Sequence, residues 1–164
     1  MKITIDVSVL SEKLREAIAE EIFDAKILSE LAKDTSKNVR AAVAENSNTA
    51  AETLSRLAED KDIYVKKGVA RNRKTPAETL GKLAQEGDVV LKEIVARNSN
   101  TSAKTLDELA EHEKFEIRQA VVENDNTSSK TLDKLAKDRT SIIRCKVSWH
   151  RNTSAKTLAM LKER

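Results

Sequence analysis

One basic residue recurs every 26 residues along the chain and could form a binding surface. The series is Arg40, Lys66, Lys92, Arg118 and Arg144. Regularly spaced cations of this kind would suit phosphate groups or an acidic partner. An acidic series accompanies it, six positions earlier in each case: Asp34, Asp60, Glu86 and Asp138, with His112 in the remaining place. The alternative is therefore that the basic residues form ion pairs between neighbouring repeats or cap the loops, where an exposed pair is typically worth less than about 1 kcal/mol.

The last stretch of the chain is the second candidate for binding. Residues 136–164 contain eight Lys and Arg against Asp138 and Glu163, a net charge of +6, which leaves −3 for the rest of the chain. The candidate residues in this stretch are Arg144, Lys146, Trp149, His150 and Arg151. Trp149 takes a place that holds Glu or Arg in the other repeats, so we expect it to face solvent, where it could stack on a base or anchor a peptide. The alternative is that Trp149 folds down beside Met160 and covers the carboxyl-terminal end.

No arrangement typical of an active site or a cofactor site occurs in the sequence. The two histidines, His112 and His150, are 38 residues apart, which gives neither a metal-binding spacing nor a catalytic triad. The three glycines form no phosphate-binding loop. The single cysteine, Cys145, excludes an internal disulfide, and we interpret it as an incidental thiol. We therefore expect no enzymatic activity, no cofactor and no metal.

All of these positions belong to a 26-residue repeat that occurs five times without a gap. The blocks are Ala32–Leu57, Ala58–Leu83, Ala84–Leu109, Ala110–Leu135 and Ala136–Leu161. Each block has four large apolar positions, in the first block Val39 and Val43, then Leu54 and Leu57. Spacings of three and four residues place each pair on one helical face. A fixed period of this length is typical of solenoids, in which each repeat buries its apolar face against its neighbours.

Two helices are predicted in each block. The second begins after a threonine such as Thr49, which we expect to cap it, and Thr75-Pro76-Ala77-Glu78 has the pattern of a capping box. We expect about ten helical residues there. The first helix, around Val39–Ala44, is expected to be shorter, either α or 3₁₀, and to end at an asparagine such as Asn46, a residue that tolerates the left-handed conformation. The recurring Asn and Thr side chains are expected to satisfy backbone groups.

The first 31 residues differ from the repeats. Helical spacing of apolar residues between Leu10 and Ile22 predicts a capping helix, and Ala25–Leu31 has the pattern of the second half of a repeat. Residues 1–9 alternate apolar and polar side chains, as in a strand. They form either an extended tail on the first helices or a homodimer contact with the same segment of a second copy. The predicted organisation is thus residues 1–31 as the N-terminal segment, 32–161 as the repeats and 162–164 as a tail.

Three runs between residues 57 and 80 resemble a unit of the leucine-rich repeat variant family. They are Leu57-Ala58-Glu59-Asp60, Val69-Ala70-Arg71-Asn72 and Thr75-Pro76-Ala77-Glu78-Thr79-Leu80. The resemblance extends over residues 25–161 and implies an all-α fold, a right-handed α-solenoid superhelix of alternating α and short α or 3₁₀ helices, HEAT-like in general architecture. The founding type of the family also has an amino-terminal cysteine cluster for an iron–sulfur centre. Because Cys145 is the only cysteine, no such cluster is carried over.

Composition agrees with a helical repeat protein. Glycine and proline are scarce and only four residues are aromatic, so the core must be aliphatic. No apolar run approaches the roughly 18 residues that a membrane span needs, and we expect a cytoplasmic protein without membrane contact. The leading functional hypothesis is a non-enzymatic scaffold that binds a protein or peptide. The alternative is a nucleic-acid-binding helical-repeat module that uses the basic series and the basic last repeat.

Overall fold

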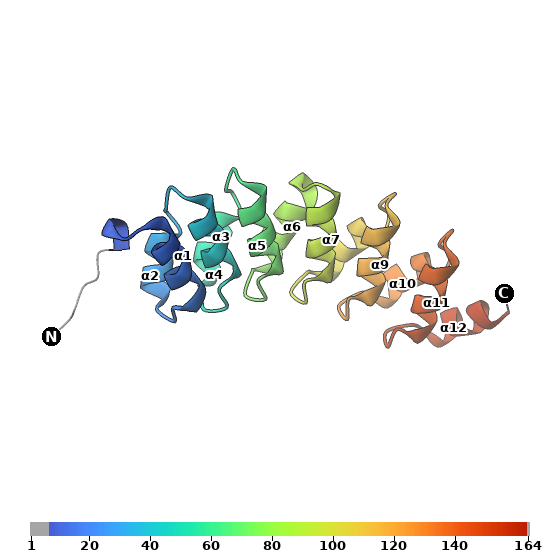
Figure 1. Cartoon of the computed structure of the whole chain (residues 1–164). Helices are drawn as coiled ribbons and strands as arrows, with labels where there is room; N and C mark the ends of the chain where they lie inside the picture. The colour runs from blue at the N-terminus through green and yellow to red at the C-terminus, as the bar shows by residue number, and fades with distance from the viewer. Residues whose placement is uncertain (1–6, 164) are drawn as a thin grey trace. The chain divides into compact units, whose positions relative to one another are not determined.

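The computed structural model of the chain describes residues 7–163, and every regular element in this range is helical. One 3₁₀ turn is followed by twelve α-helices (Figure 1). Their bounds are η1 (Val7–Val9), α1 (Glu12–Glu21), α2 (Ala25–Leu31), α3 (Lys37–Glu45), α4 (Ala51–Leu57), α5 (Ile63–Arg71), α6 (Ala77–Glu86), α7 (Val89–Arg97), α8 (Ala103–Leu109), α9 (Phe115–Glu123), α10 (Ser129–Leu135), α11 (Ser141–Trp149) and α12 (Ala155–Lys162). The prediction of an all-α repeat protein is confirmed.

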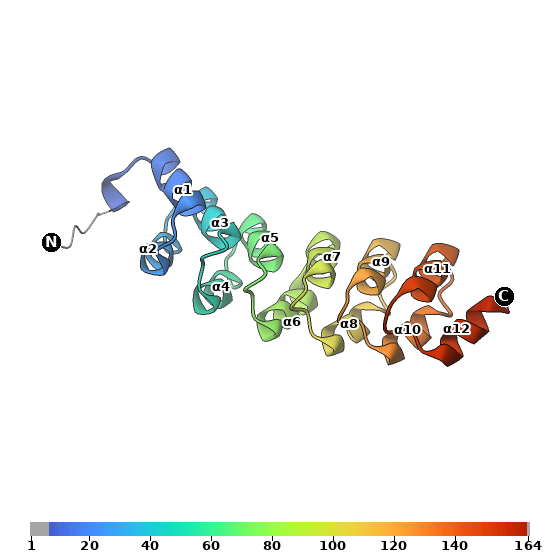
Figure 2. The ribbon, with the colours of Figure 1, turned by 90° about the horizontal axis from the view of Figure 1, so that it is seen from below.

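The chain divides into two compact units, Met1–Pro76 and Ala77–Arg164, and the division falls between the two helices of one repeat, α5 and α6. In the first unit α1, α3 and α5 form one row, with α2 and α4 beside it (Figure 2). In the second unit α7, α9 and α11 form the corresponding row, accompanied by α6, α8, α10 and α12. We call the helices of the first kind row helices; within a unit, each packs against the next.

The core of each unit is aliphatic and consists of the predicted apolar positions. The side chains with no more than 1% exposure at these positions are Val39, Val43, Leu54, Val65, Val69, Leu80, Leu91, Val95, Leu106, Ile117, Val121, Leu132, Ile143 and Val147. Full burial of one such side chain stabilises the fold by roughly 1.5–3 kcal/mol. Only Leu158 and Leu161, in the last repeat, are half-buried instead of buried.

The relative lengths of the two helices differ from the prediction. All five row helices of the repeats are α-helices of nine residues, and no described copy is 3₁₀. Some begin early because a polar side chain caps an additional turn: Asp62 accepts a hydrogen bond from the Tyr64 N–H, and Ser36 and Asp88 act in the same way. The second helix has only seven residues in α4, α8 and α10.

The predicted capping role of the threonines is wrong. Each of the five threonine hydroxyls donates to a carbonyl six residues earlier, in the last turn of the preceding row helix; Thr49 Oγ1 lies 2.5 Å from the Val43 oxygen. The N-cap is the next residue, which is a hydrogen-bonding serine in the later repeats (Ser102, Ser128 and Ser154) and Ala50 in the first. The threonine thus closes the end of the row helix: its hydroxyl donates a second hydrogen bond to a carbonyl of the last turn, which already accepts the N–H of the residue that ends the helix.

The asparagines that end the row helices join neighbouring repeats. In the second unit Asn124 Nδ2 donates to the carbonyls of Ala96 (2.7 Å) and Asn98 (2.9 Å), and its Oδ1 accepts from the Asn126 N–H (2.9 Å). Asn72 makes the same bonds to Ala44 and Asn46 in the first unit. None of the described residues has a left-handed backbone, so that part of the prediction is wrong, whereas satisfaction of backbone groups is confirmed.

The N-terminal prediction is tested only in part. The capping helix is present as α1, and the half repeat as α2. Val7–Val9 form a 3₁₀ turn where an extended strand was predicted. Residues 1–6, including Ile3 and Ile5 of the strand pattern, lie outside the described residues.

Candidate functional site

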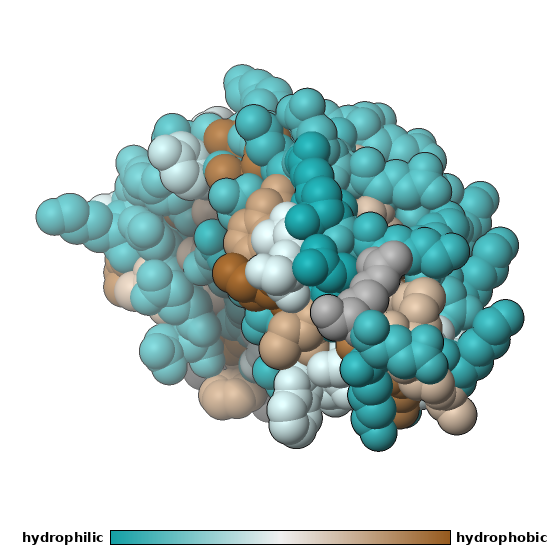
Figure 3. All heavy atoms as spheres, turned by 90° about the vertical axis from the view of Figure 1, so that its right-hand side faces the viewer, coloured by the Kyte–Doolittle hydropathy of each residue, from teal (hydrophilic) through white to brown (hydrophobic). Residues whose placement is uncertain are grey.

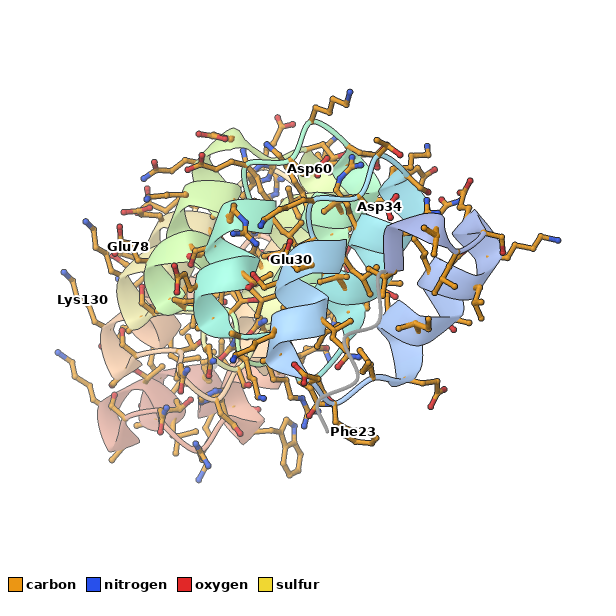
Figure 4. All side chains as sticks on the ribbon, turned by 90° about the vertical axis from the view of Figure 1, so that its left-hand side faces the viewer. Phe23, Glu30, Asp34, Asp60, Glu78 and Lys130 are labelled. Carbon is orange, nitrogen blue, oxygen red and sulfur yellow. The ribbon has the colours of Figure 1, made fainter. Side chains whose placement is uncertain are left out.

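Arg40, the first member of the basic series, is buried in an ion pair between repeats. Its Nε and Nη2 donate to the Asp60 carboxylate at 2.6 and 3.0 Å, and its Nη1 donates to the carbonyls of Asp34 and Thr35. Burial raises the pKa of Asp60, but the hydrogen bonds from Arg40 outweigh it and hold that pKa below 3.8. The two aspartates lie on the same edge of the first unit (Figure 4).

Arg118 repeats this arrangement in the second unit. Its Nε and Nη2 lie 2.6 and 3.1 Å from the oxygens of Asp138, and the two side chains are each only 6% exposed. Arg118 also donates to the carbonyls of His112 and Glu113. Arg40 and Arg118 therefore form ion pairs between neighbouring repeats, as the alternative interpretation of the basic series predicted. Their guanidinium groups are buried and not accessible to a ligand.

The two lysines of the series, Lys66 and Lys92, are half-buried. In the place of the aspartate, the repeat that follows Lys92 has His112. Its Nδ1 accepts a hydrogen bond from the Lys114 N–H at 3.1 Å, just as Asp138 accepts one from the Thr140 N–H. Burial lowers the pKa of His112 below 6.5, and the charge of Lys92 lowers it further, so the imidazole is neutral at pH 7.

The guanidinium group of Arg144, the last member, has two hydrogen-bonding edges. One edge forms a hydrogen bond, and the other has no partner among the described residues. Its Nη1 donates to the Asp138 carbonyl at 2.7 Å, as the Nη1 atoms of Arg40 and Arg118 do in their own loops. The edge that holds an aspartate in Arg40 and Arg118 contacts no acceptor within residues 7–163. Arg144 is thus the one arginine of the series whose second edge is left for another group in the described part of the chain.

Lys146 belongs to a charged cluster with residues of earlier repeats. Its Nζ lies 2.7 Å from Glu123 Oε1, and Arg97 Nη1 lies 2.7 Å from Glu123 Oε2. Burial raises the pKa of Glu123, but the hydrogen bonds from Lys146, Gln119 and Arg97 lower it to about 2. Lys146 is therefore neutralised by Glu123 and contributes little free positive charge.

Trp149, the last residue of α11, is 84% exposed. The expectation that it covers the carboxyl-terminal end beside Met160 is wrong, and the expectation that it faces solvent is confirmed. In the same slot the other repeats have charged residues that pair with one another, such as Arg97 with Glu123. Ile142 of the same helix is 54% exposed, and Cys145 is exposed as well.

His150 replaces the joining asparagine of the last repeat and performs the same bonding. Its Nε2 lies 3.1 Å from the Asn124 carbonyl, and its Nδ1 accepts from the Asn152 N–H at 3.0 Å. These partners require the hydrogen on Nε2, so His150 acts as a structural residue and is no longer a candidate for ligand binding.

Arg151 is exposed and lies 3.5 Å from Asp125, which is also exposed. A solvent-exposed ion pair of this kind is weak, so Arg151 remains available to a partner.

Part of the predicted site therefore remains accessible in the last repeat. We call Ile142, Arg144, Cys145, Trp149 and Arg151 the C-terminal surface. Figure 3 faces α11 and α12 and shows apolar side chains in the centre of this side of the molecule with hydrophilic ones around them. Arg40, Lys66, Lys92, Arg118, Lys146 and His150 belong instead to inter-repeat contacts or half-buried positions.

A second surface feature, in the first unit, was missed by sequence reasoning. A hollow of about 370 Å³ beside the end of α1 is lined by Glu20, Glu21, Glu45 and Phe23. Phe23 is 82% exposed and projects outward on the side opposite Asp34 (Figure 4). The available signal was an aromatic residue that lies outside the helical spacing of α1 and directly precedes a capping aspartate.

The described residues contain no group of three His, Cys, Asp or Glu side chains placed to hold a metal ion. Among the helices of residues 7–163, none is long and apolar enough to cross a membrane.

Comparison with known proteins agrees with the fold. The family model described as "Leucine rich repeat variant" matches residues 38–62. Among solved structures, the chain is similar to one described as "a leucine-rich repeat variant with a novel repetitive protein structural motif", with a TM-score of 0.66 and 26% sequence identity. The match covers 87% of this chain and 57% of that chain, so the chain spans little more than half of the length of that structure. A search of curated protein sequences found no match.

Paired helices that recur every 26 residues and are joined by buried Asn and Arg side chains define an α-helical repeat protein. Its repeats are of the leucine-rich repeat variant type, as the sequence motifs indicated.

Proposed function

We propose that the chain is a non-enzymatic interaction module that binds a protein or peptide through the C-terminal surface. The observation that carries the proposal is the exposure of Trp149, 84%, in a chain whose large aliphatic side chains mostly form the core. Exposed tryptophan and arginine side chains are the residue types that most often dominate the energy of protein interfaces. Arg144 and Arg151 lie in the same repeat as Trp149, so the last repeat supplies both residue types.

The chemistry of the surface favours an acidic partner with apolar side chains. The segment Ser141–Arg151 contains Arg144, Lys146 and Arg151 and no acidic residue. The unused edge of Arg144 fits a carboxylate in the two-point geometry that Arg118 forms with Asp138. Ile142 and Trp149 supply exposed apolar area on the same helix.

Nucleic acid is the weaker candidate for this surface. Proteins that bind single strands stack several bases on several aromatic side chains, and the C-terminal surface has one. Lys146 is neutralised by Glu123, and Arg118 by Asp138, so the positive charge left for phosphate groups is smaller than the sequence suggested.

Fluorescence anisotropy with a labelled helical peptide rich in glutamate and leucine tests the proposal, with a labelled oligothymidylate as the comparison. We expect the peptide to bind and Trp149→Ala to weaken it at least about tenfold. Tyr64→Ala is the matched control, because Tyr64 is also an exposed aromatic residue but lies in the first unit. Its ring makes cation–π contacts with Lys37 and Lys67, both in the first unit, so we expect unchanged affinity.

The proposal is contradicted if the peptide does not bind, or if both variants bind it as the original protein does. Binding of the oligothymidylate alone, with an affinity that falls steeply between about 50 and 200 mM salt, supports the nucleic-acid function instead. Residence in the cytoplasm remains an expectation from the sequence.

A further inference from the structure

Four of the loops that precede a row helix are closed by the same kind of hydrogen bond. A side chain in the loop accepts from the backbone N–H two residues later, directly in front of the helix. The acceptor is a carboxylate in three of these loops, at Asp34, Asp60 and Asp138, and an imidazole in the fourth, at His112. An imidazole, unlike a carboxylate, ordinarily changes its charge between pH 5 and 8. The loop in front of α9 is therefore closed by a group that mild acid can change.

The hydrogen bond of His112 requires a neutral ring. Its Nδ1 accepts from the Lys114 N–H at 3.1 Å, and a protonated imidazole carries a hydrogen on both nitrogens, so it accepts no hydrogen bond. Protonation therefore turns the acceptor into a second donor that faces the Lys114 N–H. The loop from His112 to Lys114 then loses the bond that closes it.

The surroundings of His112 also oppose its protonation. Burial lowers the pKa of His112 below 6.5, and the charges of Lys92 on α7, Lys114 in the loop and Arg118 on α9 lower it further, whereas Glu113 raises it. When the loop opens to water, burial and these charges act less strongly on the ring. The open loop therefore binds a proton more readily than the closed loop, so acid favours the open form.

The same loop holds the arginine that contacts the following repeat. Arg118 Nη1 donates to the carbonyls of His112 and Glu113, both at 2.8 Å, while its Nε and Nη2 bind Asp138. Arg139 of the following repeat also donates to the Glu113 carbonyl, at 2.6 Å. Opening of the loop displaces these carbonyls, so a change at His112 reaches the contact between α9 and the next repeat.

The other end of α9 is fixed by bonds that do not titrate. Helices α7 and α9 lie side by side in the second unit (Figure 2). At the C-terminal end of α9, the Asn124 amide donates to the carbonyls of Ala96 and Asn98. Loss of the loop bond at His112 therefore releases the N-terminal end of α9, while its C-terminal end stays joined to the preceding repeat.

We propose that His112 is a pH-dependent latch of the second unit: the neutral imidazole holds the N-terminal end of α9 closed, and protonation in mild acid lets that end open about the Asn124 contact. The carboxylate of the next joint does not titrate in the same range. Burial raises the pKa of Asp138, but the hydrogen bonds from Arg118 hold it below 3.8. The latch is independent of what the C-terminal surface binds.

Amide hydrogen exchange of the full chain, followed by NMR at pH 7 and pH 5, tests the latch. Each rate is divided by the intrinsic exchange rate at that pH, because exchange itself depends on pH. The reporter is the Arg118 N–H, which donates to the Lys114 carbonyl in the first turn of α9. We expect its protection to be at least about threefold lower at pH 5, which corresponds to the loss of one ordinary hydrogen bond.

The chain contains matched control amides in the equivalent place of other repeats. The Arg40 N–H donates to the Ser36 carbonyl and the Arg144 N–H to the Thr140 carbonyl, and carboxylates close both loops. We expect their protection to be the same at both pH values. The Asn124 N–H, at the other end of α9, is also expected to keep its protection.

Three variants separate the latch from a general effect of acid. His112→Asn retains a side-chain acceptor that does not titrate, so we expect the Arg118 N–H to lose its pH response. His150→Asn leaves His112 as the only histidine, so the response should be unchanged. Lys92→Gln removes a cation that opposes protonation of the closed loop, so the response should become smaller.

Several outcomes overturn the inference. They are equal protection of the Arg118 N–H at pH 7 and pH 5, a response that persists in His112→Asn, and an equal loss at Arg40 and Arg144, which would indicate unfolding of the whole chain. Equal loss at Asn124 would contradict the fixed end of α9. A direct NMR titration of the original protein needs no variant: an imidazole of His112 that titrates at or above its ordinary pKa also overturns the latch.

Discussion

Replacement of Asn124 by alanine tests the view that buried asparagine side chains join the repeats. The change removes two donated hydrogen bonds, to the Ala96 and Asn98 carbonyls, and one accepted from the Asn126 N–H. Asn124 is only 6% exposed, so water replaces these bonds poorly. A buried polar group left without a partner costs about 1–3 kcal/mol, and partial relaxation of the loop lowers the sum over three groups. We expect a loss of about 2–4 kcal/mol.

Urea unfolding followed by circular dichroism measures this loss. Trp149, the only tryptophan, reports at the same time on α11, which packs against α9, the helix that Asn124 ends. Because repeats are stabilised by their neighbours, we expect the fluorescence transition of Asn124→Ala to shift at least as far as the dichroism transition.

The neighbouring Asp125→Asn is the matched control. Asp125 is exposed, and its ion pair with Arg151 spans 3.5 Å at the surface, so the change should alter stability by less than about 0.5 kcal/mol. The reasoning is refuted if Asn124→Ala costs no more than this control. Asn124→His should recover part of the loss, because His150 makes the equivalent bonds in the last repeat.

Three further predictions concern the other inter-repeat contacts. Arg118→Ala leaves Asp138 buried without its cation and should cost about 3–5 kcal/mol in urea unfolding. His112→Asp restores the usual acid opposite Lys92 and should raise the urea midpoint. In the original protein the folded-state pKa of His112 lies below 6.5, so the unfolded chain binds a proton first as the pH falls. The stability of the original protein is therefore highest above pH 6.5 and decreases below it. The Asp variant should lack that loss of stability between pH 7 and 5. His150→Asn should stabilise the last repeat or leave it unchanged, as measured by Trp149 fluorescence in urea.

These predictions have separate controls. Lys137→Ala, an exposed change next to Asp138, should be near neutral, and a comparable loss in both variants would contradict a special role for Arg118. An unchanged pH profile in His112→Asp would show that the histidine is not the titrating group. A clear loss of stability in His150→Asn would refute the equivalence of the imidazole and the amide in this slot.

Much of the fold could be predicted from the sequence because the pattern repeats. Apolar residues such as Val95 and Leu106 recur at spacings that only one face of a helix satisfies, and the structure buries them. Helix ends were predicted less well. Thr101 was assigned to the helix that follows it, yet its hydroxyl bonds to Val95 in the helix before it. A hydroxyl can serve either helix end, and local sequence does not distinguish them.

The candidate site was predicted only in part. Exposure of Trp149 and the basic character of the last repeat followed from departures from the repeat. The ion pair of Arg118 was one of two interpretations of the basic series, and the sequence did not decide between that pair and a binding role; the structure places the guanidinium on an aspartate 20 residues later.

By itself, the sequence determined the helix pairs, the aliphatic core and the absence of motifs typical of catalysis, since these depend on residue type and local spacing. Only the tertiary structure decided which cations are neutralised and which remain open. Arg40 and Arg144 have the same chemistry and the same place in the repeat, but Arg40 meets a carboxylate of the next repeat, whereas Arg144 meets none within residues 7–163. An ion pair between repeats is set by the neighbour that packs against the side chain, and that neighbour is defined in three dimensions.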